Sequence, residues 1–192
     1  LEIQPLSVFN LRLGAELVGF FGSFGFLQSF QSPRDDYSDT LLRAGRDAKQ
    51  NYSSYGAHAM IEPSVQFKLG PVALRDKVSV EYWRMKVHEG TPVFYDITLD
   101  TLISSNGWVV SNDLDLLYLH DFTSWTGTFE GARLTAGVRY TLVNPFYGER
   151  DFPAGDPGEG VKNGHHRVGP LVAFTFFDHG FTSFNKPTAL LI

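Results

Sequence analysis

The stretch SVFNLRLGAELVGFFG, residues 7–22, places apolar and polar side chains at alternating positions. The apolar set is Phe9, Leu11, Leu13, Ala15, Leu17, Gly19 and Phe21. The other set begins with Asn10, Arg12, Gly14 and Glu16. A period of two predicts a β-strand with one apolar and one polar face, because an α-helix repeats every 3.6 residues. The stretch leaves open whether its apolar face contacts a protein core or lipid.

The same alternation recurs along the chain and predicts an all-β protein of about eight strands in a single domain, residues 1–192. The expected strands cover residues 7–22, 57–69, 77–85, 94–103, 110–119, 131–143, 165–177 and 181–192. The last of them ends in the apolar run KPTALLI with no turn after it, which favours a chain cut inside a strand. A natural chain of ten or more strands therefore remains open.

The connections between these strands are of two kinds. KLGPVALRDK at 68–77 and ISSNGW at 103–108 predict tight turns, because Gly, Pro and Asn-Gly favour them. Residues 23–52 and 145–163 are long polar loops. The first contains SDTLLRAGRDAKQ, residues 38–50, which predicts a short helix, whereas the second predicts no regular element. Strict alternation of the eight expected strands places the loop 145–163 at the end of the tight turns, opposite the loop 23–52. Either one strand is miscounted or 145–163 is an unusual periplasmic or lumenal segment.

Composition narrows the classes of protein. The chain of 192 residues has a net charge of -5 and no continuous basic patch, which argues against nucleic acid as a partner. It has no cysteine, so disulfides and thiolate metal sites are excluded. No run approaches the roughly 18 apolar residues of a membrane helix. Three architectures remain: a soluble sandwich, a soluble calyx-like barrel that binds a ligand, and a membrane barrel.

Three patterns favour the membrane barrel. Several alternating stretches are longer than the roughly 5–6 residues of an average soluble strand. Short turns coexist with long loops, as at the two ends of a membrane barrel. Aromatic residues gather near strand ends, where an amphipathic ring suits the membrane interface. These residues are Phe9, Phe21, Tyr82, Trp83, Tyr95, Trp108, Tyr118, Tyr140, Phe146 and Tyr147.

The polar faces of the strands carry many ions. Burying each in a dry core would cost several kcal/mol. We therefore expect these side chains to line a wet or ion-paired lumen, with their partners on neighbouring strands, for example Glu62 or Arg139 for Arg12 and Glu16. The predicted lumen residues are Arg12, Glu16, Glu62, Lys68, Glu81, Asp96, Asp100, Asp113, Asp115, Arg133, Arg139 and Arg167.

FNLRLGAELVGF (9–20) and GARLTAGVRYTLVNPFYG (131–148) resemble strands of bacterial outer-membrane β-barrel proteins, and the pattern extends over nearly the whole chain. The resemblance implies an antiparallel up-and-down transmembrane barrel in the Gram-negative outer membrane, in contact with its lipid. It implies a small pore or a structural anchor, with small polar solutes or other envelope proteins as partners. One feature departs from the class, because its chains usually close on an aromatic residue and this one ends in Leu190, Leu191 and Ile192.

The charges also predict how the lumen is organised. Acidic residues fall on the middle strands, at Glu81, Asp96, Asp100, Asp113 and Asp115. Basic residues fall on the flanking strands, at Arg12, Arg133, Arg139 and Arg167. With about eight strands the side chains would fill the interior and pair as a plug. With ten or more strands a charge-segregated passage becomes possible.

A lipid-modifying hydrolase is the enzymatic alternative. Candidate sets are His165, His166, Asp178, His179 and Ser183, and separately His120, Asp121 and Ser124. No motif fixes a nucleophile, and adjacent strand residues such as His165 and His166 point to opposite faces, so no catalytic residue is assigned.

Metal ligands are also sparse in the sequence. His58 and Glu62 would lie roughly 13 Å apart on one strand, too far for a metal pair. Asp35, Asp36 and Asp39 lack the spacing of a calcium loop. We expect no metal and no cofactor.

Overall fold

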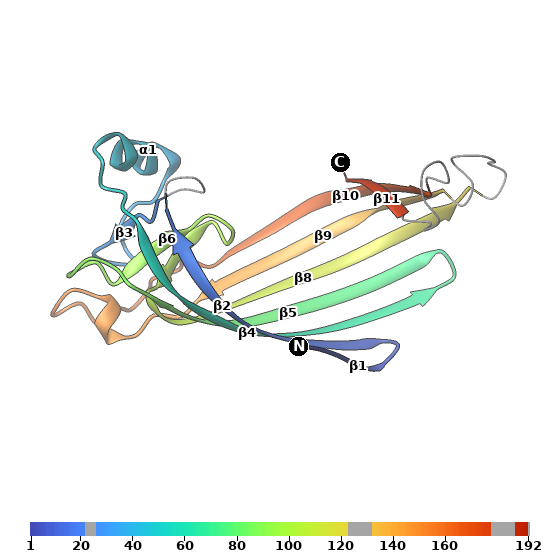
Figure 1. Ribbon diagram of the computed structural model, residues 1–192, viewed down its shortest axis with the longest axis horizontal. Helices are drawn as coiled ribbons and strands as arrows, with labels where there is room; N and C mark the ends of the chain where they lie inside the picture. The colour runs from blue at the N-terminus through green and yellow to red at the C-terminus, as the bar shows by residue number, and fades with distance from the viewer. Residues whose placement is uncertain (22–25, 123–131, 178–186, 192) are drawn as a thin grey trace.

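The computed structural model of the chain describes residues 1–21, 26–122, 132–177 and 187–191 (Figure 1). Its main feature is a sheet of eight antiparallel strands in the order β1, β2, β4, β5, β8, β9, β10, β11. The strands are β1 Glu2–Leu6, β2 Phe9–Phe20, β4 Ser54–Leu69, β5 Val72–Met85, β8 Asn106–Asp121, β9 Arg133–Pro145, β10 His165–Phe177 and β11 Pro187–Leu191. The antiparallel all-β prediction is confirmed. Since β1 and β11 are the two open edges of the described sheet, closure into a barrel stays a prediction.

Smaller elements gather at one end of this sheet (Figure 1). They are a three-stranded sheet of β3 Ser29–Phe30, β6 Val93–Asp96 and β7 Thr101–Ser104, and the helix α1 Asp39–Asp47. The helix lies within the predicted range 38–50. The loop 145–163, where no regular element was expected, contains a short 3-10 helix at Glu149–Asp151. We call the described residues 26–53, 86–105 and 146–164 the cap.

The predicted strand over 94–103 is wrong. It is a hairpin of the cap, because the Asp96 carboxylate accepts the backbone N–H groups of Thr98 and Leu99 and the chain reverses between β6 and β7. Asp100 closes the turn with a positive φ of 53°. The large sheet still has eight strands because β1, which the sequence patterns missed, pairs with β2. With 94–103 removed from the count, the loop 145–163 lies at the same end of the sheet as the loop 23–52. Residues 122–132 and 178–186 connect β8 to β9 and β10 to β11 at the opposite end.

The turn in KLGPVALRDK has the expected tight geometry. Leu69 pairs with Val72, so the hairpin between β4 and β5 has a two-residue loop, Gly70–Pro71. Gly70 has a φ of 59°, and proline fixes the next φ at a negative value, which together define a type II′ turn. ISSNGW is also a short connection, but it joins the small sheet to β8 rather than two neighbours of the large sheet.

The register of the large sheet separates its two faces. Along β2, β4, β5, β8, β9 and β10, alternate residues align across the strands. Every exposed large hydrophobic side chain described on these six strands lies on one face, which we call the apolar face. These are Leu17, Tyr55, Ile61, Val65, Phe67, Leu69, Val72, Trp108, Leu114, Leu116, Tyr118, Val138 and Val168. Leu17 is 93 % exposed and Leu69 is 87 % exposed.

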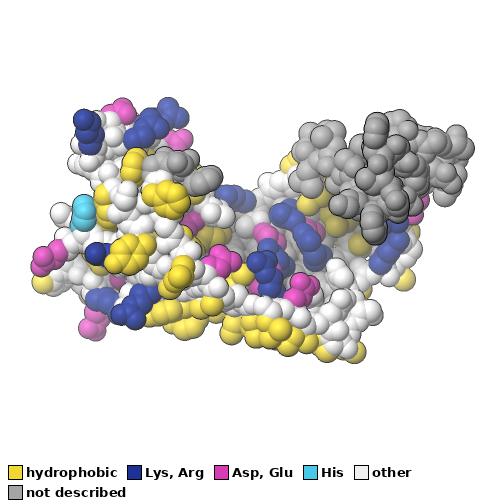
Figure 2. Space-filling model, in the orientation of Figure 1, with side chains coloured by type: hydrophobic (Ala, Val, Ile, Leu, Met, Phe, Trp, Pro, Cys, Tyr) yellow, Lys and Arg dark blue, Asp and Glu magenta, His cyan; other side chains and the backbone are white. Residues whose placement is uncertain are grey.

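The opposite face, which we call the charged face, carries Lys, Arg, Asp and Glu side chains. Figure 2 shows these ions in the hollow of the molecule and hydrophobic side chains along its lower margin. At the cap end, however, the charged face becomes apolar and packs against the small sheet. The buried cluster there is Leu27, Trp83, Met85, Phe94, Ile103, Val109 and Val143. The cap is thus held on the charged face by a hydrophobic core.

Candidate functional site: the charged face of the sheet

The structure places ten of the twelve predicted lumen residues on the charged face. They are Arg12, Glu16, Glu62, Lys68, Glu81, Asp113, Asp115, Arg133, Arg139 and Arg167. The strands supply them from alternate positions, so the spacing of two that predicts a strand also gathers the ions on one side.

Asp115 lies at the centre of the charged face with its side chain fully buried. Arg75 donates to Asp115 Oδ2 from Nε at 3.0 Å and from Nη2 at 2.6 Å. Arg139 donates from Nε to Oδ1 at 2.7 Å and from Nη2 to Oδ2 at 3.0 Å. Four charge-assisted hydrogen bonds compensate the loss of water around one carboxylate.

Arg75 was absent from the predicted set. The predicted strand began at residue 77, and Arg75 fell in the range assigned to the turn. The missed signal is that Arg75 stands two residues before Lys77, in phase with Ser79 and Glu81. In the structure β5 begins at Val72, immediately after the two-residue turn.

A second group of ions crosses the sheet beside Asp115. Lys77 Nζ lies 3.6 Å from Glu62 Oε2 and 3.6 Å from Asp113 Oδ2. Arg12 Nη1 lies 3.7 Å from Glu62 Oε1, and Thr141 donates to Asp113 at 2.7 Å. Arg12 thus meets Glu62 on the neighbouring strand.

The predicted segregation of acids on middle strands and bases on flanking strands is wrong. The middle strand β5 itself carries two bases, Arg75 and Lys77, and each contacts carboxylates from its neighbours. Opposite charges face one another across adjacent strands because such pairs stabilise a sheet and like pairs destabilise it.

Asp96 and Asp100 are the two predicted lumen residues that lie elsewhere, because they belong to the hairpin of the cap. Burial raises the pKa of Asp96, and the N–H groups of Leu99 and Thr98 oppose this rise. Asp100 accepts a hydrogen bond from Tyr95 Oη at 2.6 Å and one from Arg167 Nη2 at 2.7 Å. Asp100 therefore joins the cap to β10 instead of lining the sheet.

A buried histidine, His58, lies between the central ions and the cap. His58 Nε2 is 2.9 Å from Glu81 Oε2, although the two atoms are not aligned as a hydrogen bond, and Nδ1 is 3.9 Å from Glu16 Oε2. The His58 ring stacks on Trp83 with centroids 4.2 Å apart. Glu16 thus meets His58 rather than Arg139. Ser79 donates to Glu81 Oε1 at 2.9 Å, so the acid and not the histidine stands next to the hydroxyl.

With Glu81 between Ser79 and His58, these residues do not suit nucleophilic catalysis, which requires the base to lie beside the hydroxyl. His165 lies on the charged face and His166 on the other, where its Nδ1 is 2.6 Å from Tyr140 Oη. His120 and Asp121 also point to opposite faces. Asp121 pairs with Arg133. The candidates Ser124, Asp178, His179 and Ser183 lie outside the described residues.

In the described residues, no group of three or more His, Asp or Glu side chains is arranged to hold a metal ion. Asp35 accepts the N–H groups of Gln31 and Ser32, and Asp36 accepts that of Ser38. These two carboxylates therefore fix local turns.

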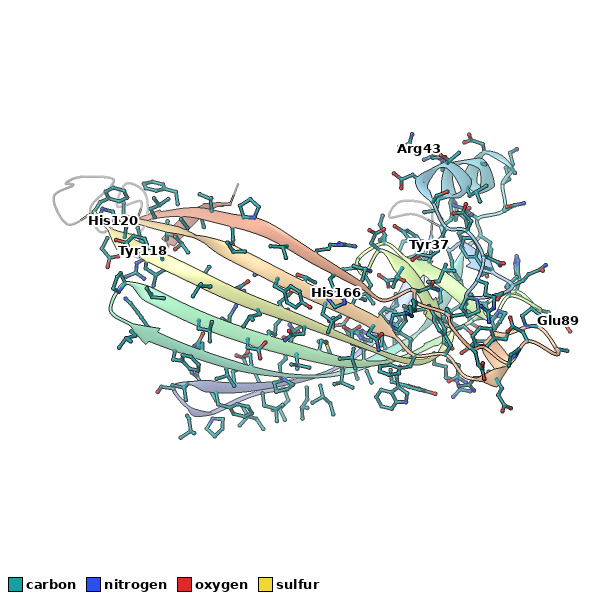
Figure 3. All side chains as sticks on the ribbon, turned by 180° about the vertical axis from the view of Figure 1, so that it is seen from behind. Tyr37, Arg43, Glu89, Tyr118, His120 and His166 are labelled. Atoms are coloured by element: carbon teal, nitrogen blue, oxygen red, sulfur yellow. The ribbon has the colours of Figure 1, made fainter. Side chains whose placement is uncertain are left out.

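The apolar face has aromatic side chains near both ends. Tyr82 and Trp108 lie together near the cap, with ring centroids 4.9 Å apart. Tyr118 and His120 lie at the far end (Figure 3). Asp76 interrupts the apolar surface and accepts a hydrogen bond from Asn112 of β8. Among the described helices, none is long and apolar enough to span a membrane.

Comparison of the chain with family models, with curated proteins and with solved structures found no match.

Proposed function

We propose that this chain forms the wall of a β-barrel in the outer membrane of a Gram-negative bacterium. In this proposal the apolar face contacts lipid, and the charged face lines a narrow polar pore for small solutes. The observation that carries the proposal is the separation of side chains by face. On the six long strands the exposed large hydrophobic residues share one face, and the ion-paired residues share the other.

The dimensions of the apolar face support contact with lipid. Trp108 and Tyr118 lie ten positions apart on β8, which corresponds to about 33 Å along a strand at roughly 3.3 Å per residue. A strand tilted by about 40° would then cover about 25 Å of membrane thickness, the height of the apolar band in outer-membrane barrels. Tyr55 and Phe67 bracket β4 in the same way.

The connections support the same orientation. The three segments that form the cap lie at one end of the sheet and are each about 19 residues or longer. At the other end β1–β2 and β4–β5 are joined by two-residue turns, and the shorter segments 122–132 and 178–186 join the remaining pairs. Outer-membrane barrels have long extracellular loops and short periplasmic turns. We therefore assign the cap to the extracellular side.

The two alternatives fit the side chains less well. A soluble calyx encloses an apolar ligand and needs its apolar residues on the inner face. Here the hollow lies on the charged face, and the opposite face exposes Leu17 and Leu69 almost fully. For a hydrolase, the described Ser79, Glu81 and His58 have the wrong order for a base-activated hydroxyl.

Two neighbouring residues of β8 provide the test. The chain has no cysteine, so Val110→Cys and Ser111→Cys each introduce one label site, on the apolar and the charged face respectively. In lipid vesicles we expect a nitroxide at 110 to collide with oxygen dissolved in lipid, and one at 111 to collide with a water-soluble nickel chelate. A water-exposed label at 110 would contradict the proposal.

Conductance of the purified protein across a planar bilayer tests the pore itself. Discrete steps of current are expected. If the label at 110 lies in lipid but the protein passes no current, the pore is overturned. The protein would then be a membrane barrel that acts as a structural anchor.

Strand closure has a direct test as well. Single cysteines placed in β1 and β11 would form a disulfide within one chain if the two edges meet, and between chains if the sheet is completed by a second copy.

A further inference from the structure

The charged face contains a hollow of about 660 Å³ on the side of Asp115 away from the cap. Its polar lining includes Lys68, Arg75, Arg139 and Asp115, and its apolar lining includes Leu117 and Leu171. A volume of this size is typical of ligand sites, which span about 300–1,000 Å³. The hollow therefore has room for a small organic molecule.

The two arginines are held in fixed positions and keep unused donors. Each guanidinium binds Asp115 through Nε and Nη2, and Nη1 of each has no hydrogen-bond partner among the described residues. Their side chains are 42 % and 37 % exposed. Planar guanidinium groups that are already oriented suit carboxylate and phosphate oxygens, because little side-chain entropy is lost on binding.

The local charge favours an anion. Three cations, Lys68, Arg75 and Arg139, line the hollow against the single carboxylate of Asp115. Lys68 lies within 4 Å of no carboxylate in the described part of the chain. The described carboxylate that interacts electrostatically with Lys68 is Asp121, which lies outside the lining of the hollow and already pairs with Arg133. An incoming anion would therefore meet an excess of positive charge within the hollow itself.

Hydrocarbon lies directly beside these cations. Leu117 and Leu171 flank Gly137 across β8, β9 and β10, in the row of the charged face next to Asp115 and Arg139. Ala73 extends the same row on β5. A ligand whose acid group meets the arginines would place its next carbons on these side chains, where burial of apolar surface adds to binding.

We infer that this hollow binds small amphipathic anions, namely organic acids with a short hydrocarbon chain. The carboxylate would contact Arg75 and Arg139, with Lys68 adding charge, and the chain would pack on Leu117 and Leu171. This inference deepens the proposed function, because it names a class of solute for the same face. It requires only the geometry of the sheet, so it can be tested apart from conduction.

The test uses the full chain in a neutral detergent, with octanoate as the probe and isothermal titration calorimetry as the readout. We expect saturable binding of octanoate, at least tenfold weaker binding of acetate, and no saturable binding of octyltrimethylammonium. Equal binding of octanoate and octyltrimethylammonium would show simple partition into detergent and overturn the inference.

Lys68→Glu is the informative variant, because no described ion pair depends on Lys68 and the fold should be unaffected. We expect it to weaken octanoate binding about tenfold. The triple variant Arg75→Gln, Asp115→Asn, Arg139→Gln removes the site without leaving an unpaired buried ion, and should abolish binding. Arg12→Gln, a change of charge outside the hollow, is the control and should bind as the unmodified chain does.

The two proposals fail in different ways. Octanoate binding that is unchanged in Lys68→Glu and in the triple variant would overturn the anion site, even if the protein conducts. Specific octanoate binding by a protein that passes no current would retain the site and overturn the pore.

Discussion

At the scale of single residues, the feature that most constrains the sheet is the buried carboxylate of Asp115. It accepts hydrogen bonds from two arginines that reach it from the neighbouring strands β5 and β9. A buried ion is tolerated only with such partners, because desolvation costs several kcal/mol. The three side chains therefore fix the register of three strands at once.

Asp115→Ala should destabilise the protein by about 3 kcal/mol, because two adjacent guanidinium groups would lose their shared counterion. The measurement is the free energy of unfolding from urea titrations in lipid vesicles, followed by tryptophan fluorescence. Asp121→Ala is the control. Its ion pair with Arg133 is roughly half exposed, so its loss should cost less than about 1 kcal/mol.

Two glycines of the charged face provide a matched pair. A Cβ built on Gly137 would lie 2.1 Å from the backbone oxygen of Leu116, whereas one on Gly169 would meet no atom within 4 Å. Gly137→Ala should therefore cost about 1–3 kcal/mol through overpacking against backbone. Gly169→Ala should be neutral or stabilise by up to about 1 kcal/mol, since alanine restricts the unfolded chain.

The same urea titrations measure both variants. Equal stability of Gly137→Ala and Gly169→Ala would mean that β8 and β9 are not as closely spaced at Leu116 as the structure has them.

At the scale of elements, the hairpin of β6 and β7 is the centre of the cap. Phe94 and Ile103 enter the buried cluster from this hairpin, and Arg34 binds Asp156 at 2.7 Å to join two of its long segments. Asp100 and Arg167 add the contact to β10. The cap is therefore a folded unit held by both packing and ion pairs.

The cap should lose stability as the pH rises, because of Asp96. Burial raises the pKa of this carboxyl, so the folded cap holds the proton more tightly than the unfolded chain. The stabilisation is complete below the unfolded pKa of about 3.9 and is lost as the pH rises through the raised folded pKa. Hydrogen exchange of the β6–β7 amides, corrected for intrinsic rates, should show this trend.

Asp96→Asn should remove that pH dependence while keeping an oxygen for the N–H groups of Thr98 and Leu99. Asp156 should make the opposite contribution to the pH dependence of cap stability, because the hydrogen bond from Arg34 lowers the pKa of its carboxyl. Its contribution is present above about pH 3.9 and is lost as the pH falls. A β6–β7 hairpin whose protection is independent of pH in the unmodified chain would contradict the role given to Asp96.

Alternation predicted most of the long strands because one face of each is apolar throughout. It failed at 94–103, where Tyr95, Ile97 and Leu99 alternate across a turn set by Asp96. It missed β1 because this strand is short and contains Pro5, and proline argues against a strand unless the strand lies at the edge of a sheet, as β1 does.

For the candidate site, alternation placed ten residues on one face but could not provide their partners. The partners of Asp115 depend on the register between β5, β8 and β9. Register is a long-range property that a single strand does not encode, so the pairing of Arg75 with Asp115 and the hollow beside it could be seen only in the fold.

At the scale of the whole molecule, the apolar face covers most of the sheet. It is interrupted by Asp76 with Asn112, by Arg84 and His166 towards the cap, and by His120 at the far end. A water-soluble protein rarely exposes so large an apolar surface. The charged face carries the hollow, and the proposed barrel gives the two faces different surroundings.

A charge at the centre of the apolar face should therefore block membrane insertion. Leu114→Arg, between Trp108 and Tyr118 on β8, should destabilise the folded form in lipid vesicles by about 2–4 kcal/mol, the cost of arginine near the bilayer midplane. Heat-sensitive mobility on gels after folding into vesicles measures the folded fraction. Ser111→Arg, on the charged face of the same strand, is the control and should fold more fully. Equal folding of both variants would contradict contact of this face with lipid.

The unequal ends of the sheet also determine how such a wall could assemble. The cap contains buried polar groups and ion pairs, so carrying it across a hydrocarbon layer would be costly. The Gly70–Pro71 turn is small and uncharged. In the proposed barrel, insertion would therefore proceed with the end opposite the cap leading, so the fold itself would set the direction in which the chain crosses the bilayer.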